Sequence, residues 1–296
     1  MPMIVDPDAP LVTPPETVTS PEGWLTAVID EPWAGVVLAY DATASTPVPD
    51  AADIRKVEIV RQDPGASAPV PVRSGDLAWA VEGIGQAYDH ESPLGVAVAY
   101  TARPMYADGT WGPSTSLAVT VPAPAAGQSR DLWVKSVGEP GLSMRVMLMP
   151  AQGTTSTARQ DTAARSGSPY TAVAYDTAAA PAETVSVDVL AEDIAQFRRL
   201  IRSGVLLAQV RPGYQIPDRF FVPGDVAEKP TGKLGSTGGY TVTFDIVPIE
   251  RPDTAGQPMC APGWSYDAVT AAFATYDAVT ASYASYAALA TNGAVE

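Results

Sequence analysis

Residues 95–122 read GVAVAYTARPMYADGTWGPSTSLAVTVP, and this stretch decides the fold of the first part of the chain. Its two ends, GVAVAYTAR and SLAVTVP, alternate apolar and polar residues as strands with one buried face do. The loop between them carries Asp108-Gly109, a pair typical of tight hairpin turns. The stretch therefore predicts an antiparallel β-hairpin. Tyr106 and Trp111 lie in the loop, so we expect them at an exposed tip as candidate surface contacts.

Four more β-rich runs precede this hairpin, separated by Pro, Gly and Asp at intervals of roughly ten to twenty residues. They are WLTAVID (24–30), GVVLAY (35–40), RKVEIVRQ (55–62) and LAWAVEG (77–83). Such spacing suits a β-sandwich of about seven strands. Residues 23–122 are therefore predicted to form one β-sandwich domain. The alternation in LAWAVEG predicts that Trp79 belongs to its core.

A Pro/Ala-rich linker, residues 123–130, precedes a second predicted β domain over residues 131–252. Its strand-like runs are DLWVKSV (131–137), LSMRVMLM (142–149), YTAVAYD (170–176), TVSVDVL (184–190), VLLAQV (205–210), RFFV (219–222) and YTVTFDIVPIE (240–250). A polar Ser/Thr/Ala/Gly stretch, residues 152–169, separates the second of these runs from the third. One helix is expected at about 191–203, because its apolar residues share a face and Gly204 follows as a helix-ending glycine.

Residues 253–296 carry a repeat with a period of ten, in which Tyr266, Tyr276 and Tyr286 occupy the same position. A hydroxyl residue precedes each Tyr and suits a helix cap, so we expect short capped helical turns. One straight helix fits poorly, because ten residues would rotate the apolar stripe by roughly 80° per repeat. The stripe is too thin to be a core, so either this chain or a partner must cover it. The candidate docking residues are Tyr266, Val269, Phe273, Tyr276, Val279, Tyr283, Tyr286 and Leu289.

Composition narrows the classes of partner. The net charge is −15, so attraction to nucleic acid or to an anionic membrane surface is not expected. A single cysteine, Cys260, excludes a disulfide framework within one chain. The proline-rich residues 1–22 predict an extended arm and contain no secretory signal, and no stretch predicts a membrane span.

The sequence offers no catalytic constellation. His90 is the only histidine, and it lies between Asp89 and Glu91, where we expect a solvated loop residue. The G-x-S-x-G, H-E-x-x-H and G-x-x-x-x-G-K-[ST] motifs are lacking. We therefore expect a protein that is not an enzyme and has no catalytic, cofactor or metal site.

Several stretches resemble one family. The S/T-[WY]-D-x-[VL] units at the C-terminus, and the D-x-E-x-P-x-G segment formed by residues 89–95, resemble minor tail proteins of siphophages that infect actinobacteria. Residues 95–122 look like the final hairpin of a fibronectin type III domain. The order of elements in 131–252 resembles the β-sandwich or split-barrel domain of distal tail proteins. The repeat departs from the commonest pattern, with Tyr where those units usually begin with Trp.

The resemblance implies a mainly β protein that is a structural component of a phage tail tip. It implies either the closed ring that joins the tail tube to the adsorption apparatus or a minor tail protein attached to that ring. In both cases the resemblance implies a homo-oligomer that docks other phage tail proteins. Such a protein assembles in the bacterial host cytoplasm and belongs to the virion tail. The alternative is a glycan or host cell-wall binding module, in which Trp24, Trp33, Trp79 or Trp111 would stack on sugars. The mass in solution distinguishes a ring from a monomeric binding module.

Overall fold

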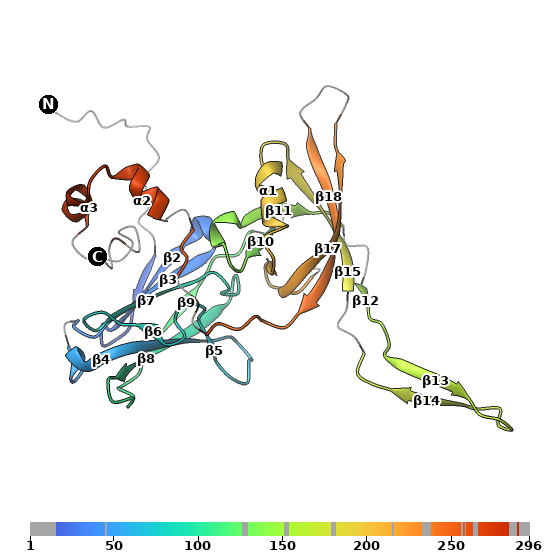
Figure 1. Cartoon of the computed structure of the whole chain (residues 1–296), viewed down its shortest axis with the longest axis horizontal. Coiled ribbons are helices and arrows are strands. Elements are labelled where there is room, and N and C mark those ends of the chain that lie inside the picture. The colour runs from blue at the N-terminus through green and yellow to red at the C-terminus, as the bar shows by residue number, and fades with distance from the viewer. Residues whose placement is uncertain are drawn as a thin grey trace.

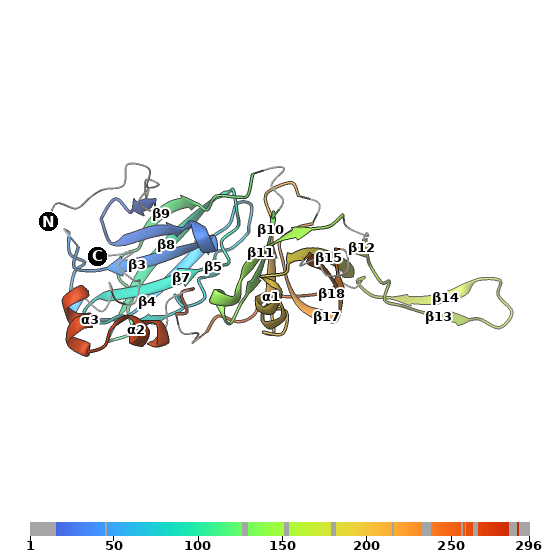
Figure 2. The same ribbon diagram turned by 90° about the horizontal axis from the view of Figure 1, so that it is seen from above.

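The computed structural model describes residues 16–44, 46–125, 130–150, 154–178, 182–214, 216–232, 238–255, 257, 259–262, 266–283 and 289. The fold is mainly β, as the sequence predicts. Two β domains lie side by side, each with its own apolar core, and a long hairpin projects from the second (Figure 1). Two short C-terminal helices lie on the side of the first domain in both views (Figures 1 and 2).

The first domain is a sandwich of two antiparallel sheets. One has the order β1-β2-β3-β7, formed by Thr17–Thr19, Leu25–Asp30, Gly35–Asp41 and Ile84–Asp89. The other has the order β5-β4-β8-β9, formed by Val70–Pro71, Ile54–Gln62, Ala97–Tyr106 and Thr115–Thr120, with β6 (Ala78–Trp79) paired to β4. Strands β8 and β9 form the predicted hairpin, with Ala97 opposite Thr120. Alternate residues of β9 are buried, which is the pattern read in the sequence.

Two expectations for this domain are wrong. Trp79 is 74% exposed and is not a core residue. The run LAWAVEG does not continue as a strand, because Leu77 and Glu82 have left-handed backbone conformations with φ of 56° and 54°. Only β6 remains of it, and β7 follows where no strand was predicted. The first sheet also begins before residue 23, because β1 lies within the expected arm (residues 1–22) and pairs with β2. Residues 1–15 of this arm lie outside the described residues.

The second domain is a sheet that closes on itself. The strands follow the order β11-β10-β16-β17-β18-β15, formed by Met144–Leu148, Leu132–Ser136, Leu206–Gln209, Arg219–Pro230, Gly239–Ile249 and Ala182–Leu190. Strand β11 also pairs with β15, which closes the ring of strands. Helix α1 (Ile194–Leu200) buries Ile194, Phe197 and Leu200 in the core of this domain. The predicted helix is therefore present but shorter than 191–203.

The polar stretch at 152–169, in which the sequence predicts no strand, contains two strands. It contributes β12 (Thr154–Thr155), paired to β15, and β13 (Gln160–Ala164). Strand β13 pairs with β14 (Thr171–Tyr175) in the hairpin that extends beyond the rest of the molecule (Figures 1 and 2). Strand β14 lies within the predicted run YTAVAYD, but β12 and β13 escape prediction because no apolar alternation marks them: every residue of β13 is exposed.

After β18 the chain returns to the first domain. Met259 packs against Val28, Val37 and Tyr88 on the outer face of its first sheet. Beyond it, α2 (Tyr266–Ala272) and α3 (Tyr276–Ser282) are separate short helices. Within the described residues, no helix combines the length and the apolar character needed to span a membrane.

Candidate functional site

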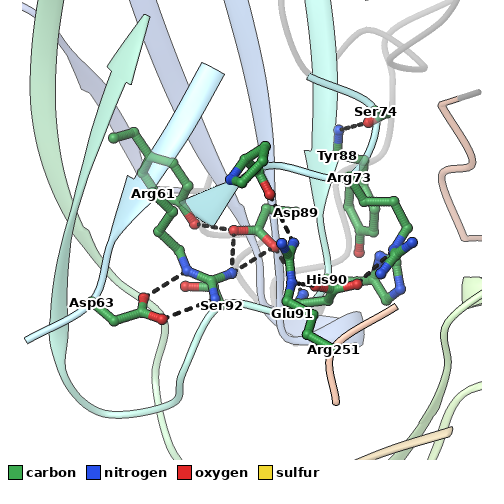
Figure 3. Close-up of polar contacts among 12 residues, drawn as sticks. Arg61, Asp63, Arg73, Ser74, Tyr88, Asp89, His90, Glu91, Ser92 and Arg251 are labelled. Carbon is green, nitrogen blue, oxygen red and sulfur yellow. Dashed lines mark hydrogen bonds and ion pairs between the residues drawn. The ribbon is translucent and has the colours of Figure 1, made fainter. Parts of the chain in front are cut away.

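A set of buried and half-buried titratable residues lies where the two domains meet. It comprises Arg61, Asp63, Arg73, Asp89, His90, Glu91, Lys135 and Arg251, which we call the junction cluster. Figure 3 labels all of them except Lys135. The central residues Asp89, His90 and Glu91 come from the end of β7 and the two residues after it. Arg61 lies on β4, Lys135 on β10, and Arg251 two residues after the end of β18. Elements of both domains and the returning chain therefore meet here.

Asp89 is the best satisfied carboxylate of the cluster. Its oxygens accept hydrogen bonds from Arg61 Nη1 at 2.7 and 3.0 Å, from the Tyr100 hydroxyl at 2.9 Å and from the Glu91 backbone N–H at 2.9 Å. Burial acts to raise the pKa of Asp89, but the charge and hydrogen bonds of Arg61, with the other donors, outweigh it and hold the pKa at about 2. Asp89 is therefore ionised at neutral pH and fixes the segment that follows it.

Glu91 joins the returning chain to the first domain. Arg73 Nε donates to Glu91 Oε1 at 2.6 Å, and Arg251 Nε donates to Glu91 Oε2 at 2.7 Å. The two arginines continue the connection, since Arg73 also donates to the carbonyl oxygens of Pro252 and Asp253. One buried carboxylate thus compensates two guanidinium groups from distant parts of the chain.

Strands β10 and β16 supply the second-domain side of this junction. Lys135 Nζ donates to the carbonyl oxygens of Ala34 at 2.7 Å and His90 at 2.8 Å. Gln209 Nε2 donates to the carbonyl oxygens of Glu91 and Ser92, both at 3.0 Å. Burial lowers the pKa of Lys135 to about 7, against the attraction of Asp89, Asp218 and Glu91. Trp133, two residues before Lys135, packs into the core cluster of the first domain.

His90 is buried, so the expectation of a solvated loop residue is wrong. Only 4% of the residue is exposed, and its ring stacks on Tyr88 with 6.1 Å between centroids. Neither ring nitrogen has a hydrogen-bond partner among the described residues. Burial lowers the pKa of His90 to about 4, so the ring is neutral at pH 7. The loop is buried because the second domain covers it, and nothing in the local sequence indicates that cover.

The arrangement acts as a clamp between domains. Asp89 and Glu91, on either side of His90 in the sequence, both form ion pairs with arginine side chains. Only 1% of Asp89 and 3% of Glu91 is exposed to solvent. Within the described part of the chain, no group of three or more His, Cys, Asp or Glu side chains is placed to hold a metal ion. Sequence reasoning missed Arg61 and Lys135, because in a strand pattern they look like outward-facing polar residues.

A second candidate site is the hairpin of β13 and β14, residues 159–176, which we call the hairpin arm. Tyr170 is 78% exposed, Val173 50% and Tyr175 85%. The arm carries two arginines, Arg159 and Arg165, and two aspartates, Asp161 and Asp176, so its net charge is zero in a chain of −15. The arm thus presents exposed apolar side chains with no net charge, at the end of the molecule farthest from the first domain (Figure 2).

The candidate docking residues of the C-terminus lie on and beside α2 and α3. Val269, Phe273, Val279, Tyr283 and Leu289 are half-buried, and the rings of Phe273 and Tyr283 meet edge to face at 5.8 Å. Tyr276, in contrast, is 85% exposed. Tyr266 begins α2, and Tyr286 lies outside the described residues. The structure therefore brings Phe273 and Tyr283 together and turns Tyr276 outward.

The two aromatic residues of the first-domain loop differ. Trp111 is 42% exposed, with the Arg103 guanidinium 3.9 Å from its ring centroid. Tyr106 ends β8, packs against the first core, and donates its hydroxyl to the Pro49 carbonyl at 2.8 Å. Of this pair, Trp111 remains the better candidate for a surface contact.

Neither a model of a protein family nor a curated protein matches the chain.

Proposed function

We propose that the chain is a structural subunit of a phage tail tip, which assembles with copies of itself into a ring and docks other tail proteins. The observation that carries this proposal is the hairpin arm. A two-stranded hairpin is at best marginally stable alone in water. This arm has no layer packed on it, because both faces of β13 and β14 are exposed. Its stable position is therefore against another chain.

The occupant we assign to that position is a second copy of the same chain. Two acidic copies, each with a net charge of −15, repel one another at long range. The neutral hairpin arm can approach an acidic neighbour without that penalty. Tyr170 and Tyr175 then supply the exposed aromatic surface that anchors protein interfaces.

The junction cluster also suits a ring subunit. A head-to-tail interface closes into a ring only when each subunit holds the same angle between its contact surfaces. Paired charges and buried backbone contacts between the domains hold that angle in this chain. A flexible linker alone would not do so.

The strand order supports the family resemblance at the level of domains. In the first domain, β2-β3-β7 face β5-β4-β8-β9, an order consistent with a fibronectin type III-like sandwich. In the second, the closed sheet with one helix is consistent with a split-barrel domain of distal tail proteins. We infer from these orders that the resemblance extends beyond the short motifs.

The hairpin arm provides the test. Gln160 and Tyr175 lie directly opposite each other, so Asn-Gly in place of residues 161–174 closes the arm at its base without disturbing β15. We expect this variant to keep the circular dichroism spectrum and melting temperature of the full chain. Light scattering at tens of micromolar should show a ring-sized oligomer for the full chain and a monomer for the variant.

A matched variant controls for loss of exposed aromatic surface in general. Trp79→Ala removes an aromatic residue that is 74% exposed on the first domain, far from the arm, and should leave the oligomer intact. A full chain that stays monomeric, or an oligomer that survives removal of the arm, would contradict the proposal.

A further inference from the structure

A pocket of about 570 Å³ lies on the first domain, against β4, β6 and β7 and the returning C-terminal segment. Its volume falls in the range of small-molecule sites, roughly 300–1,000 Å³. The residues that matter here are Lys56, Asp76, Trp79, Gln86 and Gln257. The pocket is distinct from the junction cluster, the hairpin arm and the docking residues of the C-terminus.

Trp79 gives the pocket a flat apolar wall. The residue is 74% exposed, although Trp is among the residues that gain most from burial. Lys56 Nζ lies 5.1 Å from the ring centroid and covers only part of the ring. Leu77, two residues before Trp79, also lines the pocket and has a strained left-handed backbone, with φ of 56°. Such strain in a bulky residue is concentrated at functional sites.

Gln86 gives the pocket an unsatisfied hydrogen-bond donor. Its Nε2 is buried and has no hydrogen-bond partner among the described residues. Buried side-chain donors nearly always have a partner, so an orphan donor in a pocket wall indicates a missing acceptor. A ligand hydroxyl or carbonyl oxygen in the pocket could supply it.

The charges of the pocket favour a neutral ligand. Lys56 and Asp76 carry opposite charges, and the chain as a whole repels anions. Asp76 accepts a hydrogen bond from Thr254, which holds the carboxylate at the pocket wall. Carboxylate, ammonium and amide groups around a flat indole suit a ligand with many hydroxyl groups and one apolar face.

We propose that this pocket binds a neutral carbohydrate. The C–H groups on one face of a pyranose ring stack on the indole of Trp79, and its hydroxyl groups bond to Gln86, Asp76 and Gln257. The inference does not depend on assembly into a ring, since every residue in it belongs to one chain. It gives the molecule a glycan-binding activity in addition to its proposed structural role.

The test titrates the full chain with glucose, galactose, mannose, xylose, N-acetylglucosamine, cellobiose and lactose, followed by ligand-observed NMR and isothermal calorimetry. We expect saturable binding of at least one sugar. Trp79→Ala should weaken that binding about tenfold or more, because it removes the stacking surface. Gln86→Leu, of similar volume, should weaken it several-fold by removing the donor.

Trp111→Ala is the matched control. Trp111 is also an exposed Trp beside a cationic side chain, with Arg103 in the place of Lys56, but it does not line the pocket. Its replacement should leave sugar affinity unchanged. Absence of binding for the whole panel, or equal affinity in the parent and Trp79→Ala, would overturn the inference. Loss of sugar binding would leave the oligomer, and so the proposed function, unaffected.

Discussion

At the scale of single residues, His90 couples the packing of the two domains to pH. Its ring lies under the second domain in a site that disfavours the charged form, so the folded protein resists protonation until about pH 4. The unfolded chain takes up the proton near its ordinary pKa of 6.5. Between about pH 4 and pH 6.5 the imidazole of His90 is therefore more protonated in the unfolded chain than in the folded protein. The free energy of unfolding consequently decreases as the pH falls through this range.

We therefore predict that His90→Phe removes this loss. Phe fills the same space, keeps the stack on Tyr88 and needs no hydrogen-bond partner. Between pH 7 and about 5, the parent should lose about 2 kcal/mol more free energy of unfolding than the variant does. Urea unfolding measures both, and pH 5 avoids precipitation near the isoelectric point of 4.4.

The comparison is clean because the chain contains one histidine, so carboxylates shared by both proteins cancel in the difference. Equal pH slopes in the parent and His90→Phe would mean that the ring reaches water in solution. The sequence expectation of a solvated loop residue would then be restored.

At the scale of elements, prediction from sequence succeeds where one face of a strand meets a core. Strands β4, β8, β9 and β15 carry the buried alternation, and each was predicted. Strand β13 lacks a buried face, so its sequence has no pattern to detect. The run LAWAVEG is predicted as a strand with alternating burial, but only Ala78–Trp79 forms a strand, because the left-handed backbone of Leu77 and Glu82 ends the extended conformation on either side. Local alternation therefore predicts burial only when the backbone can stay extended.

The C-terminal helices permit a test of docking that does not disturb the fold. Tyr276 begins α3 and is 85% exposed, so Tyr276→Asp should change the free energy of unfolding by less than about 0.5 kcal/mol. If this face docks on a neighbouring chain, the buried charge should nevertheless reduce the oligomer measured by light scattering.

Ala281→Asp is the matched control on the same helix. It is also exposed, but five residues at about 100° each turn it roughly 140° away from Tyr276. Its replacement should leave the oligomer intact. Equal effects of both aspartates would point to charge alone, and no effect of Tyr276→Asp would remove Tyr276 from the docking residues.

At the scale of the whole molecule, composition predicts the number of domains but not how they meet. Strand β10 reads as an ordinary strand in DLWVKSV, although all five of its residues are buried. Lys135 and Gln209 face the first domain, and their partners, the carbonyl oxygens of residues 34 and 90–92, have no side-chain signature. Contacts to backbone oxygens across a domain boundary leave no pattern in a single sequence.

The decisive residue of this junction is Glu91, and the final prediction concerns its charge. Glu91→Gln leaves the guanidinium groups of Arg73 and Arg251 without their shared carboxylate in a buried site. Breaking a buried pair in this way costs about 3 to 5 kcal/mol. The matched control is Glu58→Gln, which breaks the more exposed pair with Arg103 on the same domain and should cost about 1 kcal/mol. Calorimetry should show an earlier melting of Glu91→Gln that separates into two transitions, because the returning chain no longer ties the domains together. Similar small losses in both variants would mean that the backbone contacts of Lys135 and Gln209 hold the junction without this carboxylate.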